Sequence, residues 1–142
     1  MSYYWVWEFW ARCAESHSKA KAAAQQRKPS LVVCPQILVG HWALEISKFV
    51  AEDVLLPLAY EGSPHARQLL QKQFQSADVV IMSYETLRAD SASLLKQQWH
   101  YCILDEGHVI RNSKAKISQV WFQPRWFARQ GLKPFGHGTP AC

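Results

Sequence analysis

The sequence predicts an α/β protein with a mostly parallel β-sheet flanked by helices. Three short, mainly apolar runs occur along the chain, and segments of helical composition or periodicity separate them. Runs of this length are typical of strands buried on both faces. Strands that alternate with helices favour right-handed β–α–β units and therefore a parallel sheet. The three runs are Leu31–Cys34, Asp78–Met82 and His100–Leu104.

The composition of the 142-residue chain, with 49% hydrophobic and 19% charged residues, indicates one globular domain or a piece of a larger one. No apolar run approaches the length of a membrane span. The aromatic segment Met1–Trp10 lacks a basic start and contains Glu8, so we expect no signal peptide. Cys34 and Cys102 lie inside apolar runs without zinc-binding spacing, which favours core thiols in a reducing compartment.

The formal net charge of +5 comes from the two ends of the chain. Residues 31–120 carry eight basic and nine acidic side chains, whereas residues 1–30 and 121–142 each contribute a net charge of +3. A high pI is typical of nucleic-acid-binding proteins. Because the basic excess lies at the ends, it does not describe the middle of the chain, where the sequence motifs lie.

A helix is expected over about residues 38–50, directly after the first strand, which Pro35 ends. Apolar side chains in this segment recur at spacings of three and four residues and form one stripe. We therefore expect this helix to pack against the sheet. The stripe consists of Leu38, Trp42, Ile46 and Phe49.

The next segment contains an additional strand and a second helix. Val54–Tyr60 is apolar, and Pro57 within it favours an edge strand or a bulge. Ser63 is suited to cap a helix whose first residue is Pro64 and which is expected to run to about Phe74. The chain therefore returns to a helix before the strand that contains Val79.

The chain is expected to have three parts. Residues 1–29 are an atypical N-terminal segment that is partly helical, and residues 121–142 are an irregular tail. Residues 30–120 between them hold the α/β domain. Two further short helices are expected there, over about residues 91–96 and 114–120.

Two adjacent acids follow the last predicted strand of this domain and form a candidate functional site. Asp105 and Glu106 follow His100–Leu104, and Gly107 and His108 come next. Ligands bind at the carboxyl ends of parallel strands, and nucleoside triphosphatases use acids there to handle the metal ion and the attacking water. The alternative is an ordinary strand-to-loop exit with two solvated acids.

Three segments together resemble the Snf2 family of DNA-translocating ATPases, which belongs to superfamily 2 of the helicases. Asp105–Lys114 looks like motif II of that family, Leu31–Trp42 resembles its motif Ia, and Asp78–Arg88 resembles its motif Ib. The three segments occur in the family's order and cover about residues 30–119. The resemblance implies that the α/β domain is an incomplete RecA-like lobe, the ATP-binding domain of these helicases.

The resemblance also implies roles for the residues of motif II. Asp105 would join the coordination of Mg²⁺ and, with Glu106, contribute to ATP binding. Glu106 would be the catalytic base. His108 would act in catalysis by coupling the nucleotide site to the DNA-contacting motifs. The implied cofactors are therefore ATP and Mg²⁺.

Motifs Ia and Ib would form a DNA-facing surface. Pro35, Gln36 and the start of the next helix would face the DNA backbone, because N–H groups at a helix N-terminus suit phosphate. Ser83 and Tyr84 would belong to a second DNA-facing loop. Trp42 lies on the apolar stripe of its helix, so we expect it to pack rather than to touch DNA.

Two strings resemble one branch of the family in particular. Gly40-His41-Trp42 and Tyr101–Ile110 look most like the branch of the TATA-binding protein-associated factors, which remove TATA-binding protein from DNA. The implied partners are double-stranded DNA and TATA-binding protein. The implied location is the nucleus, with no membrane association.

Parts of the family pattern lack a counterpart in this sequence. The family has a phosphate-binding Gly-Lys-Thr loop before motif Ia, but residues 1–30 contain no glycine. Gly138-Thr139-Pro140 faintly resembles a later motif, yet the strand before it and the second lobe are missing. We therefore expect no ATP hydrolysis by this chain alone. The alternative is a non-catalytic module that binds DNA or a transcription factor.

Overall fold

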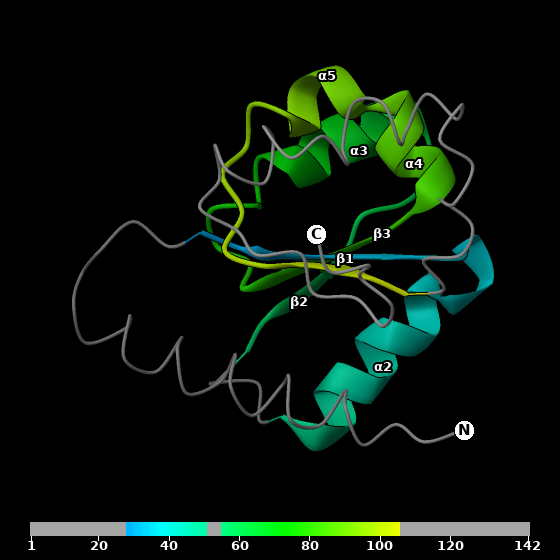
Figure 1. Cartoon of the computed structure of the whole chain (residues 1–142), viewed down its shortest axis with the longest axis vertical. Coiled ribbons are helices and arrows are strands. Elements are labelled where there is room, and N and C mark those ends of the chain that lie inside the picture. The colour runs from blue at the N-terminus through cyan, green and yellow to red at the C-terminus, as the bar shows by residue number, and fades with distance from the viewer. Residues whose placement is uncertain (1–27, 51–54, 106–142) are drawn as a thin grey trace, which may run out of the picture.

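The structure is a computed structural model that describes residues 28–50 and 55–105 (Figure 1). Within these residues strands alternate with helices, and the predicted α/β class is confirmed. Residues 106–142 lie outside the described part of the chain, and with them Glu106, His108, the helix predicted after motif II and the tail. The predicted N-terminal segment lies outside it up to residue 27.

The sheet has four parallel strands in the order β2-β3-β1-β4. β2 is therefore an edge of the described sheet, as predicted from Pro57, which begins this strand and has no N–H for a second neighbour. β4 is shorter than predicted. The strands are β1 (Ser30–Cys34), β2 (Pro57–Ala59), β3 (Val79–Ser83) and β4 (Cys102–Leu104).

The register places the carboxyl ends of three strands side by side. Cys34 at the end of β1 pairs with Ser83 at the end of β3. Val33 in β1 pairs with Leu104 at the end of β4. Because the strands are parallel, the segments that follow them all leave the sheet at the same edge.

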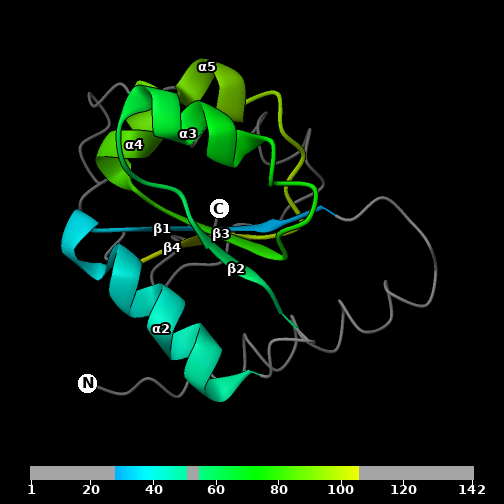
Figure 2. The same ribbon diagram turned by 180° about the vertical axis from the view of Figure 1, so that it is seen from behind.

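Helices cover both faces of the sheet and complete three layers (Figures 1 and 2). α2 lies against one face, and α3, α4 and α5 lie against the other. In the described part of the chain no helix combines the length and the apolar character that crossing a membrane requires. The helices are the short 3-10 helix η1 (Gln36–Leu38), α2 (Val39–Phe49), α3 (Pro64–Gln71), α4 (Tyr84–Ala89) and α5 (Ser91–Leu94).

The sequence signals for α2 and α3 are confirmed. α2 buries Trp42 and Ile46 of the predicted stripe against the sheet. Ser63 caps α3, because its Oγ accepts a hydrogen bond of 3.3 Å from a backbone N–H of the first turn. α3 ends at Gln71, before the predicted end at Phe74, and the chain continues in turns.

The segment after β3 differs from the prediction. The sequence predicts a loop at Ser83 and Tyr84, whereas β3 passes directly into α4 at this point. Ser83 Oγ accepts a hydrogen bond of 3.1 Å from Thr86 N and donates one of 3.0 Å to Thr86 Oγ1. This cap satisfies a backbone donor that would otherwise be free, so the helix begins without an intervening loop.

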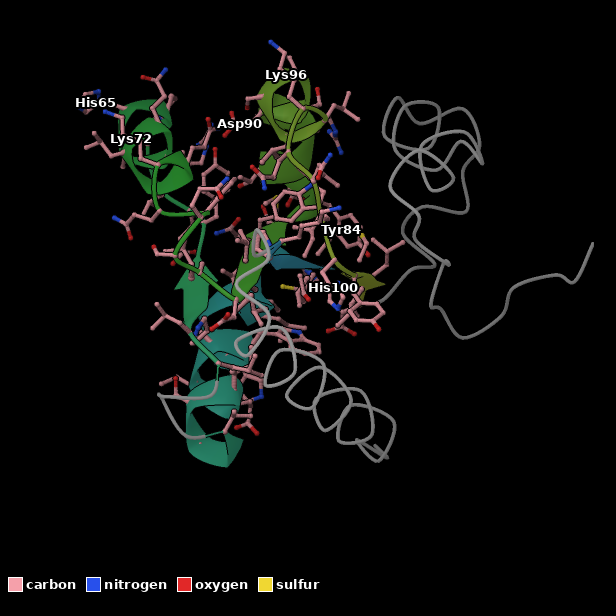
Figure 3. All side chains as sticks on the ribbon, turned by 90° about the vertical axis from the view of Figure 1, so that its left-hand side faces the viewer. His65, Lys72, Tyr84, Asp90, Lys96 and His100 are labelled. Carbon is pink, nitrogen blue, oxygen red and sulfur yellow. The ribbon has the colours of Figure 1, made fainter. Side chains whose placement is uncertain are left out.

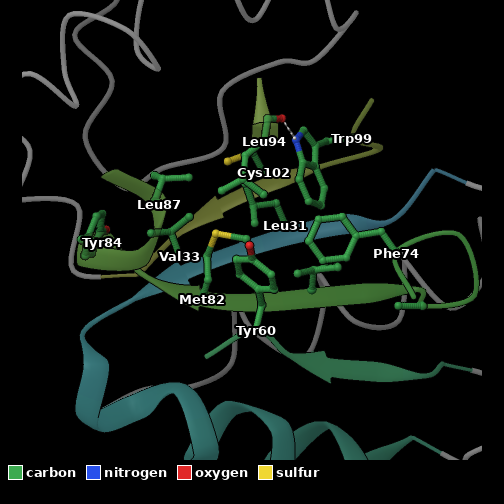
Figure 4. Packing of buried hydrophobic residues seen from close by; sticks show 12 residues of the cluster. Leu31, Val33, Tyr60, Phe74, Met82, Tyr84, Leu87, Leu94, Trp99 and Cys102 are labelled. Atoms are coloured by element: carbon green, nitrogen blue, oxygen red, sulfur yellow. Dashed lines mark hydrogen bonds between the residues drawn. The ribbon is translucent and has the colours of Figure 1, made fainter. Parts of the chain in front are cut away.

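Alternate residues of each strand point to opposite faces and build one apolar cluster under each helical layer. The cluster beneath α3, α4 and α5 is rich in aromatic side chains (Figure 4). Phe74 lies between Tyr60 and Trp99, at centroid distances of 5.2 Å and 5.6 Å. These tilted and edge-to-face contacts are favourable for aromatic rings and join the turns after α3 to the segments that follow β2 and precede β4.

The two cysteines in the described residues are core thiols, as predicted. Cys34 and Cys102 are both buried and free. Burial raises the pKa of each thiol to about 12. Neither thiol is therefore ionised at neutral pH, and both act as small apolar side chains.

A polar cluster joins α3 to the end of α4 and to Tyr60, which follows β2. Arg67 donates two hydrogen bonds to Asp90, from Nε to Oδ2 at 2.7 Å and from Nη2 to Oδ1 at 3.1 Å. Tyr60 donates to Asp90 Oδ2 at 2.6 Å, and Gln71 donates to the Tyr60 hydroxyl at 2.6 Å. These four residues form what we call the Asp90 cluster, and Figure 3 shows Asp90 in the helical layer above the sheet.

Candidate functional site

The candidate site lies where β1, β3 and β4 end. We call it the carboxyl edge and define it by Pro35–Gln36, Ser83–Tyr84 and Asp105. These segments are far apart in the sequence, and the parallel register brings them to one edge of the sheet. Predicted metal-binding and DNA-facing residues from three motifs are therefore neighbours in the fold.

Asp105 is the first residue after β4 and is anchored to the sheet by its backbone. Its N–H donates a hydrogen bond of 2.8 Å to the carbonyl oxygen of Val33 in β1. This bond extends the β1–β4 ladder by one position beyond Leu104. The side chain of Asp105 is half-buried, so the carboxylate lies at the boundary between the core and the surface.

One carboxylate oxygen of Asp105 is held by α2. Trp42 Nε1 donates a hydrogen bond of 2.9 Å to Asp105 Oδ2, across 63 residues of sequence. Trp42 is only 8% exposed, so the prediction that it packs is confirmed. Its indole satisfies its polar N–H at the same time as it fills the core, a common role for tryptophan.

The backbone of Asp105 is held from the opposite face of the sheet. The Tyr84 hydroxyl donates a hydrogen bond of 2.7 Å to the carbonyl oxygen of Asp105. Tyr84 belongs to the apolar cluster beneath α3, α4 and α5, whereas Trp42 belongs to the cluster beneath α2. Asp105 is therefore restrained by side chains from both layers.

Two acidic side chains lie close to Cys34 at the carboxyl edge. Burial is the main cause of the raised pKa of Cys34, and the nearby charges of Asp105 and Glu61 raise it further. Glu61 follows β2 at the same edge and accepts a hydrogen bond of 3.3 Å from Gln36 Nε2. Two carboxylates near the end of β1 favour a cation there.

The donor chemistry of the edge fits Mg²⁺ in a nucleotide site. Carboxylate oxygen is a preferred ligand of Mg²⁺, which usually keeps several waters and uses one or two carboxylates together with substrate phosphates. Residues 28–50 and 55–105 contain no cluster of three or more metal-ligating side chains, so a closed protein cage is absent from this part of the chain. The half-buried Asp105 can supply one such ligand.

The structure brings some predicted site residues together and leaves others out of the described range. Pro35, Gln36 and Asp105 reach the same edge, and the Gln36 side chain is exposed. Ser83 and Tyr84 also reach it, but both side chains are buried, at 0% and 3% exposure. Glu106 and His108 lie outside the described residues.

The contacts at this edge that sequence reasoning missed include those of Trp42 with Asp105 and of Glu61 with Gln36. The bond from Trp42 to Asp105 could have been suspected because a helix that follows β1 must pack beside the strands next to β1. The contact of Glu61 with Gln36 was harder to predict from the sequence, since an acid after an edge strand is ordinarily solvated. Neither contact follows from local periodicity, because each joins different elements.

The chain matches the SNF2-related domain model over residues 11–126, which is most of its length. It is 49% identical over 90 residues to TATA-binding protein-associated factor BTAF1 of Arabidopsis thaliana, covering 63% of this chain and 4% of that protein. It is 42% identical over 107 residues to human TATA-binding protein-associated factor 172, covering 75% of this chain and 6% of that protein.

A third relative is TATA-binding protein-associated factor MOT1 of Saccharomyces cerevisiae, 37% identical over 106 residues, covering 75% of this chain and 6% of that protein. The chain thus spans about one twentieth of the length of these relatives. The four-stranded parallel sheet with helices on both faces agrees with part of a RecA-like lobe. The sequence match, with the predicted motifs in order, shows that this chain belongs to the SNF2-related domain family of ATP-binding, helicase-like proteins.

Proposed function

We propose that this chain forms part of the ATP-binding lobe of a Snf2-type, DNA-dependent ATPase that remodels protein–DNA complexes. The observation that supports this most directly is the meeting of three motif segments at one sheet edge. The segments after β1 and β3 leave the sheet beside Asp105, which is bonded to both layers. We assign the lobe to residues 30–120.

We assign different roles to the two acids of motif II. Asp105 would hold Mg²⁺ through a carboxylate oxygen, and Glu106 would accept a proton from the attacking water. His108 would couple these acids to the DNA-facing segments. When bound, MgATP supplies the phosphoryl group and part of the charge neutralisation that phosphoryl transfer requires.

The DNA-facing surface consists of the segments that follow β1 and β3. Gln36 is exposed at the start of η1, which suits contact with the DNA backbone together with Pro35. Ser83 and Tyr84 are buried, so they contribute by positioning the segment after β3 rather than by touching DNA themselves. Because the relatives are named TATA-binding protein-associated factors, we assign TATA-binding protein on double-stranded DNA as the target and the nucleus as the location.

The 142 residues by themselves do not hydrolyse ATP. No Gly-Lys-Thr triplet occurs in the sequence, so the phosphates lack the loop that holds them in P-loop ATPases. We expect the purified chain to show no DNA-stimulated phosphate release, and Glu106→Gln to behave identically. DNA-stimulated activity that disappears in Glu106→Gln would overturn this part of the proposal.

A segment exchange tests the function of the lobe in a complete enzyme. Residues 30–120 would replace the matching segment of the yeast relative, and ATP hydrolysis would be measured with and without DNA. We expect the chimera to retain DNA-stimulated hydrolysis and to lose at least about 100-fold with Glu106→Gln, since the base contributes a factor of this order. A folded chimera without any hydrolysis would contradict the proposal.

A second candidate function is a non-catalytic module that binds DNA or a transcription factor. Two large apolar side chains favour it, because Ile37 in η1 is 88% exposed and Leu44 in α2 is 62% exposed. Exposed apolar side chains of this kind occur at interaction sites. An inactive chimera that still binds DNA or TATA-binding protein, and loses this binding with Ile37→Ser, would favour the module.

A further inference from the structure

We propose that Trp42 and Tyr84 are positioning residues that together fix the orientation of Asp105 for metal binding. This inference rests on the proposed function, because it gives Asp105 the metal-binding role. It adds two residues whose side chains reach neither the solvent nor the reacting atoms. Both act through Asp105 by hydrogen bonds that come from opposite faces of the sheet.

Trp42 selects which carboxylate oxygen can face a cation. Its Nε1–H is bonded to Oδ2 of Asp105 at 2.9 Å, and a carboxylate that accepts from a fixed donor loses its freedom to rotate. The indole is itself held in the apolar cluster beneath α2 at 8% exposure. Oδ1 is therefore the oxygen that we assign to the metal ion, because Oδ2 is bonded to the indole.

Tyr84 restrains the chain as it leaves β4. Its hydroxyl is bonded to the Asp105 carbonyl at 2.7 Å, next to the backbone bond from Asp105 N to the Val33 carbonyl at 2.8 Å. The N–H and the C=O of Asp105 are thus both fixed. The ring of Tyr84 is anchored in the apolar cluster beneath α3, α4 and α5 (Figure 4).

Because both side chains are buried, we infer that they position Asp105 and do not bind the metal ion themselves. Tyr84 is 3% exposed and Trp42 is 8% exposed, so neither presents its ring to a ligand at the surface. Hydrogen-bond partners of metal-binding side chains typically change metal affinity by 10- to 100-fold when they are removed. We therefore expect about a tenfold loss of affinity for Trp42→Phe, and a smaller loss for Tyr84→Phe, because Tyr84 holds the backbone rather than the carboxylate.

The test uses Mn²⁺ as a probe for the Mg²⁺ site and the complete 142-residue chain. Free Mn²⁺ is measured by electron paramagnetic resonance during titration into the millimolar range. The test variants are Tyr84→Phe, which removes only the hydroxyl, and Trp42→Phe, which removes the indole N–H together with part of the ring volume. Matched controls are Trp99→Phe, whose Nε1 donates to the Leu94 carbonyl at 3.3 Å, and Tyr60→Phe in the Asp90 cluster.

We expect Mn²⁺ affinity to fall in both test variants and to stay within about twofold of the unmodified chain in both controls. Equal losses in test and control variants would overturn the proposal, because a general loosening of the core would then explain them. If Asp105→Asn reduces the affinity but Trp42→Phe and Tyr84→Phe do not, positioning is wrong while the metal role stands. If Asp105→Asn has no effect, the metal role falls, and positioning falls with it.

If Trp42→Phe or Tyr84→Phe does not fold, NMR spectroscopy of the unmodified chain and of Asp105→Asn tests the proposal instead. In the ¹⁵N-labelled chain, the indole N–H resonance of Trp42 should move on Asp105→Asn, since the acceptor loses its charge, and should broaden on addition of Mn²⁺. The indole resonance of Trp99 serves as the internal control and should move and broaden less than that of Trp42. A Trp42 resonance that responds no more than that of Trp99 would overturn the proposal.

Discussion

Two aspartates of this domain are hydrogen-bonded in different ways, and the difference distinguishes a carboxylate that the fold neutralises from the one to which we assign metal binding. Asp90 receives two hydrogen bonds from Arg67 and one from Tyr60. Asp105 receives an indole N–H on its side chain, and within the described residues it forms no ion pair. The charge of Asp90 is thus neutralised by the fold, whereas the charge of Asp105 is oriented by the indole and is not neutralised by any residue in the described ranges.

The pKa of Asp90 reflects this arrangement. The hydrogen bond from the Arg67 guanidinium is the largest influence and holds the pKa of Asp90 below its ordinary value of 3.8, against the opposing effect of burial. The Tyr60 hydroxyl acts in the same direction as Arg67. The pKa of Tyr60 is raised to about 12, first by burial and then by its hydrogen bond to Asp90. The cluster is therefore stable as an ionised aspartate with a neutral tyrosine.

The largest effect on stability is expected from Arg67→Met. The substitution keeps much of the apolar stem but leaves Asp90 without its cation. Breaking a buried ion pair by removing one partner costs 3–5 kcal/mol, and partial exposure of this pair reduces the expected loss to about 2–3 kcal/mol. Urea unfolding followed by circular dichroism measures it. The matched variant Arg88→Met, at an exposed position, should change the unfolding free energy by less than about 0.5 kcal/mol.

An intermediate effect is expected from acid. Because the pKa of Asp90 is lower in the folded state, its contribution to stability is complete above its ordinary pKa and is lost as the pH falls through the folded pKa. The difference in unfolding free energy between the unmodified chain and Asp90→Asn should therefore be constant near neutral pH and should shrink below about pH 4. A difference that stays constant down to pH 2 would show that charge plays no part.

The smallest effect on stability is expected from Asp105→Asn. Asparagine keeps an acceptor for the Trp42 indole and removes a half-buried negative charge that the described residues do not neutralise. We expect the unfolding free energy to stay within about 0.5 kcal/mol or to rise slightly, since residues kept for function often cost stability. Urea unfolding at pH 7 makes the comparison with Arg67→Met direct. A loss as large as that of Arg67→Met would remove the distinction between the two aspartates.

Local sequence patterns predicted most of the architecture. The apolar runs at β1, β3 and β4, the stripe on α2 and the cap at Ser63 each depend on residues close together in the chain. Parallel strands followed from the alternation of strands and helices, and the edge position of β2 followed from Pro57. The helix at Tyr84 was missed, because a serine that ends a strand can also cap a helix, and the same residues are compatible with a turn.

The candidate site could be predicted only in part. Because Asp105 follows a buried strand, it could be predicted to lie at the carboxyl edge. The resemblance of three segments to the family's motifs, in the same order, indicated the family. Its hydrogen-bond partners could not be predicted, because Trp42 has the same helical spacing whether it packs on aliphatic side chains or donates to a carboxylate. Likewise, Tyr84 fits a DNA-facing segment by sequence, yet its ring is buried.

The sequence by itself determined the α/β class, because that property resides in short periodic segments, and its resemblance to the Snf2 motifs, in their order, indicated the family and an acid at the end of a strand. The tertiary structure decided which polar groups meet. The bonds from Trp42 and Tyr84 to Asp105 span 63 and 21 residues, and that from Arg67 to Asp90 spans 23. Contacts of this kind depend on the register of the sheet and on the packing of both helical layers, which local periodicity does not encode.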